Sequence, residues 1–126
     1  MSATLTMRVE TPVEITAALE ALALISERRI KAGRVRAGLY ESGVRYRREP
    51  RGEEKWLAAD EVLKAGYGDC EDLVAWRVAE LRARGERGAR PLAYQTRRPG
   101  VVHCIVVRAN GQREDPSRLL GMGGVG

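Results

Sequence analysis

Three residue types that together support acyl transfer occur in order along this chain: a cysteine, a histidine and an aspartate. Cys70 opens a helical pattern, His103 lies in an apolar run, and Asp115 follows a hairpin signal. A thiol attacks a carbonyl carbon as its thiolate, so it needs a nearby imidazole, and the imidazole needs an acceptor that fixes its tautomer. Because His103 is the only histidine, a cysteine–histidine enzyme has one choice of base.

The surroundings of Cys70 act on its thiol in opposite directions. The free N–H groups and the dipole of a helix start lower the pKa of a thiol. Negative charge nearby raises it, and three carboxylates are adjacent in the sequence: Asp69, Glu71 and Asp72. Taken alone, a free cysteine is more often a small buried apolar residue. The combination with His103 and Asp115 favours a reactive site.

The second cysteine, Cys104, follows His103 directly in the run 101–107, whose apolar residues predict a strand. Alternate side chains of a strand point to opposite faces, so we expect Cys104 to be a core residue turned away from Cys70. The same geometry disfavours a zinc site built from Cys70, His103 and Cys104, and no Cys-x-x-Cys spacing is present. A disulfide between the cysteines would compete with catalysis. We expect no metal and no cofactor.

Asp115 follows Asn110-Gly111, a dipeptide typical of a type I′ hairpin turn. We therefore expect residues 112–115 to return as an antiparallel strand beside the strand of His103. A carboxylate there can accept a hydrogen bond from one ring nitrogen and leave the other for the thiol. Asp115 can equally be a turn or capping residue ahead of Pro116. Both interpretations stay open at this point.

The elements that position these residues have local signals. Residues 4–10 alternate apolar and polar side chains and predict a strand at an edge of the sheet. Thr11, Pro12 and Glu14 form a capping box with proline at the first helical position, and they predict a helix over 12–31. Glycines and a proline break up the stretch from 35 to 55, which we interpret as a long ordered connection.

The second half of the chain predicts two helices and a small sheet. A short helix is expected over 56–65 and a longer one over 70–84, each followed by glycine. Strands are expected over 91–96 and 101–108. The predicted fold class is α+β, with helices packed on one side of a small antiparallel sheet and the helix start at Cys70 facing two strands.

Length and composition fit one folded domain spanning residues 1–126. The chain is 44% apolar and 31% charged, which is too hydrophobic for a disordered chain. It shows no secretory signal and no apolar stretch able to span a bilayer, and it has two cysteines, so we expect a cytoplasmic protein with no membrane partner. The net charge is +5, but the arginines alternate with glutamates and lack stacking aromatics. We therefore do not expect nucleic-acid binding.

Three segments together resemble a known family: 66–72, 101–107 and 115–117. The family is the transglutaminase-like branch of the papain-like cysteine enzymes, in particular the small bacterial transglutaminase-like cysteine peptidases. The resemblance covers residues 56–120, and we expect 121–126 to be a flexible tail. It implies a papain-like core in which Cys70 heads a buried helix as nucleophile. It also implies that His103 is the general base and acid and that Asp115 orients its ring.

The resemblance also indicates where an oxyanion would be held. Papain uses a glutamine upstream of its cysteine, whereas both glutamines of this chain lie downstream. The transglutaminase-like arrangement uses an upstream aromatic N–H instead, which makes Trp56 a candidate donor together with the backbone N–H of Cys70. Tyr67 and Asp69 are further pocket candidates. Trp56 and Tyr67 can otherwise be core, lid or rim residues.

The function that the resemblance implies is hydrolysis of an amide or peptide bond through a thioester on Cys70. If an amine replaces water, the same site becomes a crosslinking transglutaminase, and the residues do not choose between the two. Small chains of this kind also occur among phage and prophage genes, so a non-catalytic binding or assembly module, virion-associated in that case, is the alternative of another class. The expected partner is a peptide or protein substrate, and the sequence does not give the oligomeric state.

Overall fold

The computed structural model describes residues 11–49 and 55–123 of the 126-residue chain. It mixes helices with small sheets, which confirms the α+β class. The strand expected over 4–10 lies outside the described residues. The elements in chain order are α1 (Pro12–Lys31), η1 (Leu39–Glu41), β1 (Arg45–Tyr46), α2 (Ala59–Ala65), β2 (Tyr67–Gly68), α3 (Cys70–Ala83), β3 (Arg90–Gln95), β4 (Val102–Val107), β5 (Arg113–Glu114) and α4 (Pro116–Leu119).

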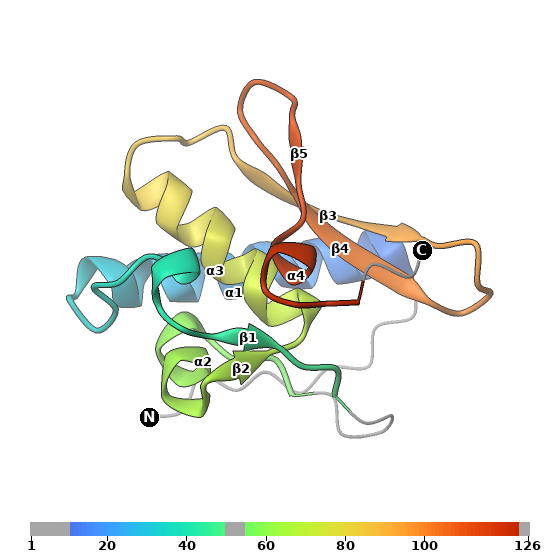
Figure 1. Cartoon of the computed structure of the whole chain (residues 1–126). Coiled ribbons are helices and arrows are strands. Elements are labelled where there is room, and N and C mark those ends of the chain that lie inside the picture. Colours follow the sequence, from blue (N-terminus) through green and yellow to red (C-terminus); the bar gives the residue numbers. More distant parts are fainter. Residues whose placement is uncertain (1–10, 50–54, 124–126) are drawn as a thin grey trace.

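Helix α3 lies at the centre of the molecule and contacts α1, α2, α4 and β4 (Figure 1). The antiparallel sheet has the order β3-β4-β5. In its register Ala93 pairs with Cys104, and Tyr94 pairs with His103. Ala93 and Cys104 are buried in one core cluster with side chains of α1 and α3. The helices therefore cover the face of the sheet that carries Cys104.

Helix α1 has the bounds that the sequence predicts. The hydroxyl oxygen of Thr11 accepts the backbone N–H of Glu14 at 3.1 Å, and the hydroxyl donates to the Glu14 carboxylate at 2.8 Å. Pro12 occupies the first turn, where its missing N–H has no partner to lose. Local capping thus determines where this helix begins.

Helix α2 is shorter than the predicted helix over 56–65, because it begins only at Ala59. The backbone N–H of Leu57 donates to the Asp72 carboxylate at 2.8 Å, and that of Ala59 donates to the Ser26 hydroxyl at 3.1 Å. These contacts hold the preceding residues in an extended segment. Tertiary hydrogen bonds therefore replace the first helical turn that the local pattern predicts.

The start of α3 is fixed by two carboxylates. Asp69 is the N-cap, and it forms a reciprocal capping box with Asp72, whose side chain accepts the Asp69 backbone N–H at 3.1 Å. The helix begins at Cys70, as predicted, and runs to Ala83. Most of its side chains are buried. Cys70 consequently lies on the first turn of the most enclosed helix.

The connection between β4 and β5 is a hairpin, but its turn type differs from the prediction. A type I′ turn needs positive φ at both central residues, whereas among the described residues only glycines, including Gly111 at +88°, have positive φ. The Gly111 N–H donates to the Arg108 carbonyl at 2.8 Å, and the Arg108 N–H donates to the Gln112 carbonyl at 2.8 Å. The loop therefore has three residues with a left-handed glycine at its end. The antiparallel return as β5 is confirmed.

A short parallel pair, β1 with β2, was not predicted from the sequence. It aligns Arg45 with Tyr67 and Tyr46 with Gly68. A Cβ on Gly68 would lie 3.1 Å from the Cβ of Asp72, so glycine permits this close approach to α3. The Tyr46 N–H donates to the Leu120 carbonyl at 2.9 Å. The pair thus ties the irregular connection to the turn that leads into α3.

The Glu114 carboxylate anchors β5 to the rest of the molecule. It accepts hydrogen bonds from the Tyr40 hydroxyl, from Arg77 Nε at 2.6 Å and from Arg108 Nη1 at 2.9 Å. Arg77 belongs to α3, and its side chain is only 12% exposed. Since Asp115 follows Glu114 directly, this network also fixes where Asp115 lies.

We expect Glu114→Ala to lower the free energy of unfolding by about 3 kcal/mol, because it leaves the Arg77 guanidinium without this partner where water is largely excluded. Chemical denaturation measures the change. Glu20 is the matched control: it pairs with Arg82 by two hydrogen bonds but is 44% exposed, so Glu20→Ala is expected to cost less than about 1 kcal/mol. Equal losses in the two variants would contradict this assignment.

Candidate active site

An open cleft of about 1160 Å³ lies between the start of α3 and the adjoining ends of β3 and β4. Four of the residues singled out from the sequence line it: Trp56, Asp69, Cys70 and His103. Typical small-molecule pockets range from about 300 to 1,000 Å³. The cleft is therefore large enough for an extended peptide segment.

The His103 ring is held by Asp115. Its Nε2 lies 2.8 Å from Oδ2 of Asp115, and the other carboxylate oxygen accepts the backbone N–H of Arg118 at 3.4 Å. The Tyr94 ring contacts the imidazole edge to face, with 5.8 Å between the ring centroids. Asp115 thus caps α4 and binds His103, so both interpretations of this residue describe what it does. The bond through Nε2 leaves Nδ1 for the thiol.

Cys70 and His103 both line the cleft and interact electrostatically, and His103 binds Asp115, so the cysteine, the ring and the Asp115 carboxylate form one connected row. A hydrogen bond to Cys104, burial and the charge of Glu71 raise the pKa of the Cys70 thiol above its ordinary value, while the hydrogen bond to His103 lowers it. His103 is therefore the contact that favours the thiolate.

The imidazole itself carries a strongly shifted pKa. The hydrogen bond to Asp115, and then the hydrogen bond to Cys70, raise the pKa of His103 to about 10, although burial opposes this. The ring is consequently a cation at neutral pH. It places a positive charge beside the sulfur, at the point where a thiolate would need it.

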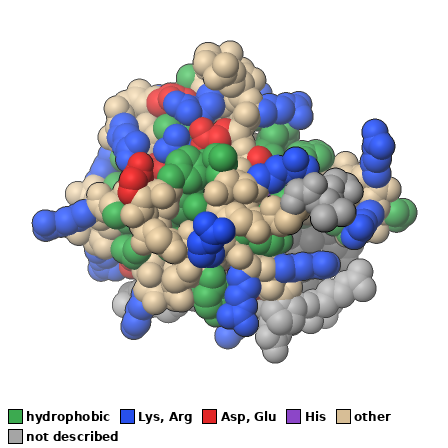
Figure 2. Space-filling model, viewed as in Figure 1, with side chains coloured by type: hydrophobic (Ala, Val, Ile, Leu, Met, Phe, Trp, Pro, Cys, Tyr) green, Lys and Arg blue, Asp and Glu red, His purple; other side chains and the backbone are tan. Residues whose placement is uncertain are grey.

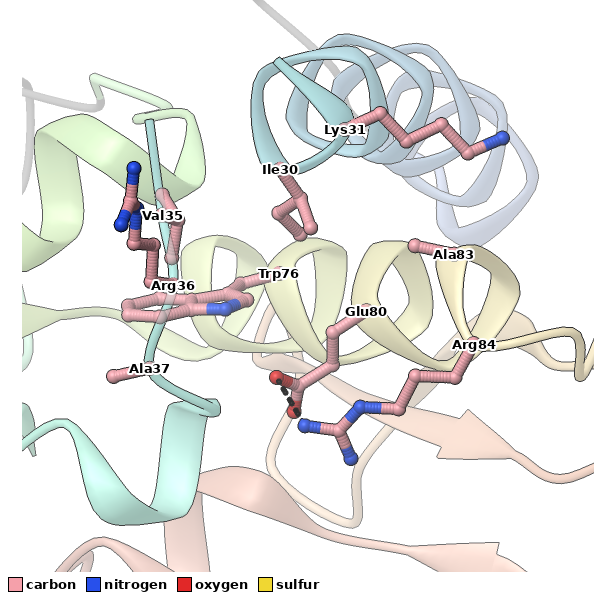
Figure 3. A pocket seen from close by; sticks show the side chains of 9 residues that line it. All are labelled: Ile30, Lys31, Val35, Arg36, Ala37, Trp76, Glu80, Ala83 and Arg84. Carbon is pink, nitrogen blue, oxygen red and sulfur yellow. Dashed lines mark ion pairs between the residues drawn. The ribbon is translucent and has the colours of Figure 1, made fainter. Parts of the chain in front are cut away.

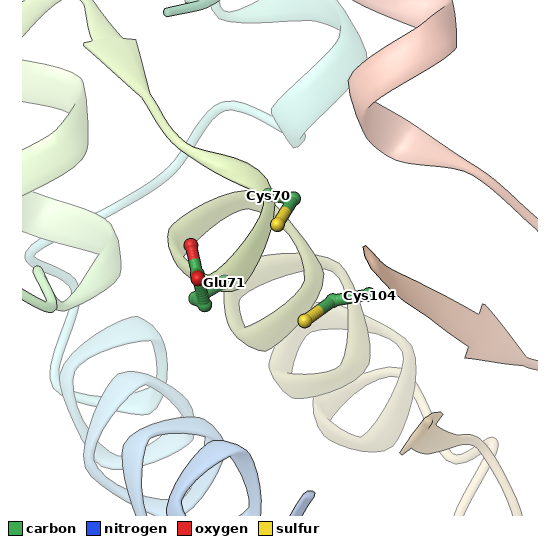
Figure 4. Close-up of side chains that lie close together, drawn as sticks. All are labelled: Cys70, Glu71 and Cys104. Atoms are coloured by element: carbon green, nitrogen blue, oxygen red, sulfur yellow. The ribbon is translucent and has the colours of Figure 1, made fainter. Parts of the chain in front are cut away.

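The prediction that Cys104 is turned away from Cys70 is wrong. Its sulfur, the sulfur of Cys70 and a carboxylate oxygen of Glu71 all lie within 4.8 Å of one another (Figure 4). Cys104 does belong to the buried helix-facing side of β4. Strand alternation determines on which face of β4 a side chain lies. A residue at the end of a helix packed against the strand can still contact side chains on both faces. Cys70 reaches both neighbours on β4.

The backbone N–H of Cys70, an expected oxyanion donor, is engaged. Oδ1 of Asp69 accepts it at 2.7 Å, while Oδ2 of Asp69 accepts the N–H of Glu49 at 3.1 Å. A substrate oxygen can use the Cys70 N–H only after the carboxylate has turned away. Asp69 therefore controls whether the Cys70 N–H is available and is not itself a donor to the oxyanion.

Trp56, the other expected donor, is buried against the cleft and belongs to the same core cluster as Cys70. The neighbouring Leu57 N–H is fixed by Asp72, which is 1% exposed and whose pKa burial raises well above its ordinary value. From the sequence, Asp72 was expected only to act as a negative charge near the start of a helix. Asp72 also holds the segment that carries Trp56, through a hydrogen bond to a residue 15 positions away in the sequence. No local sequence pattern indicates this contact.

Tyr46 is a cleft residue that the sequence analysis did not identify. Burial, together with the nearby charges of Asp69 and Cys70, raises the pKa of its hydroxyl to about 12, so the hydroxyl stays protonated and can donate. Tyr67, by contrast, is not among the residues that line the cleft. It is 37% exposed and lies beneath the Arg47 guanidinium, 4.6 Å from the ring centroid.

A second, smaller cavity of about 280 Å³ lies on another part of α3, against the end of α1 (Figure 3). The Trp76 indole lines it, and its Nε1 has no hydrogen-bond partner among the described residues. Glu80, also in the lining, pairs with Arg84 and accepts the Leu39 N–H at 3.0 Å. Neither cysteine nor the histidine lines this cavity, so the residues singled out for chemistry belong to the larger cleft.

No protein-family model, curated protein or solved structure matches this chain. The transglutaminase-like and papain-like resemblance thus rests on the residues themselves. Within the described parts of the chain, no helix has the length and apolarity needed to cross a bilayer. On the face seen in Figure 2, arginine and lysine side chains spread over several elements with acidic side chains between them.

We expect Cys104→Ala to increase the rate at which iodoacetamide alkylates Cys70 at neutral pH. The variant removes the largest cause that raises the pKa of the Cys70 thiol, and each pKa unit changes the thiolate fraction about tenfold. Mass spectrometry of the Cys70 peptide measures the rate. Cys104→Ser keeps a hydrogen-bonding group and should fall between the variant and the native chain. A rate that is unchanged or lower in Cys104→Ala would show that Cys104 does not restrain this thiol.

Proposed function

We propose that this protein is a thiol hydrolase of the transglutaminase-like cysteine peptidase type, which cleaves amide or peptide bonds through a thioester on Cys70. The observation that carries the proposal is the row of side chains from Cys70 through His103 to Asp115, with 2.8 Å between the last two. The row opens on a cleft large enough for a peptide. A structural cysteine requires neither an oriented imidazole nor a cleft.

The chemistry follows from where the protons lie. The thiol proton of Cys70 is released to solvent, because the His103 ring already carries a proton on both nitrogens, and this leaves the thiolate beside the imidazolium. The sulfur attacks the substrate carbonyl carbon, and the proton on Nδ1 passes to the leaving amine as the carbon–nitrogen bond breaks. The neutral ring then takes a proton from water, whose oxygen attacks the thioester and releases the acid and the thiolate. Asp115 stabilises the imidazolium throughout.

Two side chains are suited to stabilise the oxyanion of the tetrahedral intermediate. The indole N–H of Trp56 and the hydroxyl of Tyr46 both belong to the cleft lining, and preorganised donors of this kind supply much of the stabilisation in acyl transfer. Rotation of Asp69 would add the backbone N–H of Cys70. Substrate binding is the event that can drive this rotation, because the incoming carbonyl oxygen competes with the carboxylate for the same donor.

The cleft lining also favours a class of substrate. Four arginines contribute to it: Arg48, Arg97, Arg98 and Arg118. Arg97 and Arg98 lie on the loop between β3 and β4, which continues into the His103 strand. Guanidinium groups bind carboxylates through paired hydrogen bonds. Asp69 and Glu71, which flank Cys70, line the same cleft, so the preferred substrate is a peptide with acidic side chains toward the β3–β4 loop and not next to the scissile bond.

A non-catalytic binding or assembly module is the second candidate function, phage-related and virion-associated if the family expectation holds. A specific observation favours it: the Asp69 carboxylate occupies the Cys70 N–H, and the pKa of the Cys70 thiol is raised. Both features keep the resting thiol inactive. Cys70 would then be a structural contact, and the cleft would bind a peptide without cleaving it.

Acylation of Cys70 separates the two candidates. With p-nitrophenyl acetate in a Cys104→Ser background, we expect an acyl group on Cys70, detected by mass spectrometry, and slow release of acetate. His103→Ala should slow acylation about 10²–10⁴-fold, because the general acid–base group is lost. Asp115→Asn should slow it at least about tenfold through misorientation of the ring.

An acylation rate that does not change in His103→Ala would overturn the enzyme proposal and favour the module. Circular dichroism of each variant excludes unfolding as the cause. Addition of a primary amine then tests the acceptor: release of free acid in its presence indicates hydrolysis, whereas an amide product indicates a crosslinking transglutaminase.

A further inference from the structure

We infer that Cys70, Cys104 and Glu71 form a binding site for a thiophilic divalent cation, with Zn²⁺ as the ion of best fit. The two sulfurs and a Glu71 carboxylate oxygen lie within 4.8 Å of one another. Cys70 and Glu71 come from the first turn of α3, and Cys104 comes from β4 (Figure 4). Two elements that are already packed together therefore present three ligand atoms at one point.

The spacing is close to that of a bound ion. Zinc–sulfur bonds of about 2.3 Å and zinc–oxygen bonds of about 2.0–2.2 Å place tetrahedral ligand atoms about 3.5–3.8 Å apart. Because the three atoms lie within 4.8 Å of one another, side-chain movements of about 1 Å or less bring them to this spacing. Two thiolates select a soft or borderline ion, whereas Mg²⁺ and Ca²⁺ prefer sites made of oxygen atoms only.

Charge balance also permits the ion. Binding breaks two S–H bonds, forms two metal–sulfur bonds and releases two protons to solvent. The ion with two thiolates and one carboxylate carries one negative charge, which equals the charge of the empty site with Glu71 ionised. Cys104 is 1% exposed, and an unpaired thiolate there would be costly. The metal provides the positive partner without adding net charge to the interior.

Access is from the cleft, because Cys70 and Glu71 line it whereas Cys104 lies beneath. The fourth coordination position faces the cleft and can take water. His103 is not needed as a ligand, since its Nε2 stays on Asp115. An ion on the Cys70 sulfur prevents that sulfur from attacking a carbonyl. This block, though not the binding itself, rests on the function proposed above.

Cobalt substitution and zinc competition test the site on the full chain under reducing conditions. Co²⁺ should give a thiolate-to-cobalt charge-transfer band in the near ultraviolet at one ion per chain, with release of two protons, and Zn²⁺ should displace the Co²⁺ without further proton release. Cys104→Ser and Cys70→Ser should each weaken Zn²⁺ binding about 100-fold or more, and Glu71→Gln about tenfold, as expected for loss of a ligand. Glu49→Gln is the control, because Glu49 lines the same cleft but its carboxylate accepts the Lys55 N–H and does not belong to the group of three ligands.

Two variants distinguish failure of this inference from failure of the proposed enzyme. His103→Ala should lose Cys70 acylation but keep the cobalt band, whereas Cys104→Ser should keep acylation but lose the band. The absence of a charge-transfer band, or a band that survives in Cys104→Ser, would overturn the metal site whatever the acylation result. A band in a chain that never acylates would support the metal site and contradict the enzyme.

Discussion

The buried carboxylate of Asp72 is the constraint on which the site depends. One of its oxygens accepts the Leu57 N–H, and the other accepts the Asp69 N–H. The first bond holds the segment that carries Trp56, and the second holds the N-cap residue that precedes Cys70. A carboxylate at 1% exposure is costly to bury, and these two backbone donors offset that cost. The position of Asp72 therefore explains why α3 begins at Cys70.

The other half of the site is positioned independently, by the network around Glu114. That carboxylate ties β5 to α3 through Arg77, and Asp115 follows it at the start of α4. Asp115 then orients His103 on the neighbouring strand. Cys70 and His103 are thus held by separate anchors on one helix. Since α3 is common to both, its packing sets the distance between sulfur and ring.

Local signals in the sequence were sufficient for the long elements but not for their contacts. The capping residues predicted where α1 begins, the apolar pattern predicted α3, and the hairpin signal predicted the return beside β4, because these features depend on neighbours along the chain. The late start of α2 depends on Asp72, and the cleft position of Tyr46 depends on a two-residue parallel pair. The contact of Cys104 with Cys70 depends on how a helix end meets a strand. Such contacts join distant residues, so no local pattern encodes them. The papain-like identity of the core stays a prediction.

Nuclear magnetic resonance of the His103 ring tests directly whether thiol, imidazole and carboxylate act as one unit. Because His103 is the only histidine, ¹⁵N labelling gives a single pair of imidazole signals. We expect a ring that is doubly protonated at neutral pH and titrates with a pKa of about 10. Loss of either partner, in Asp115→Asn or in Cys70→Ala, should lower that value. A ring that titrates near the ordinary value of about 6.5, unchanged in both variants, would contradict this expectation.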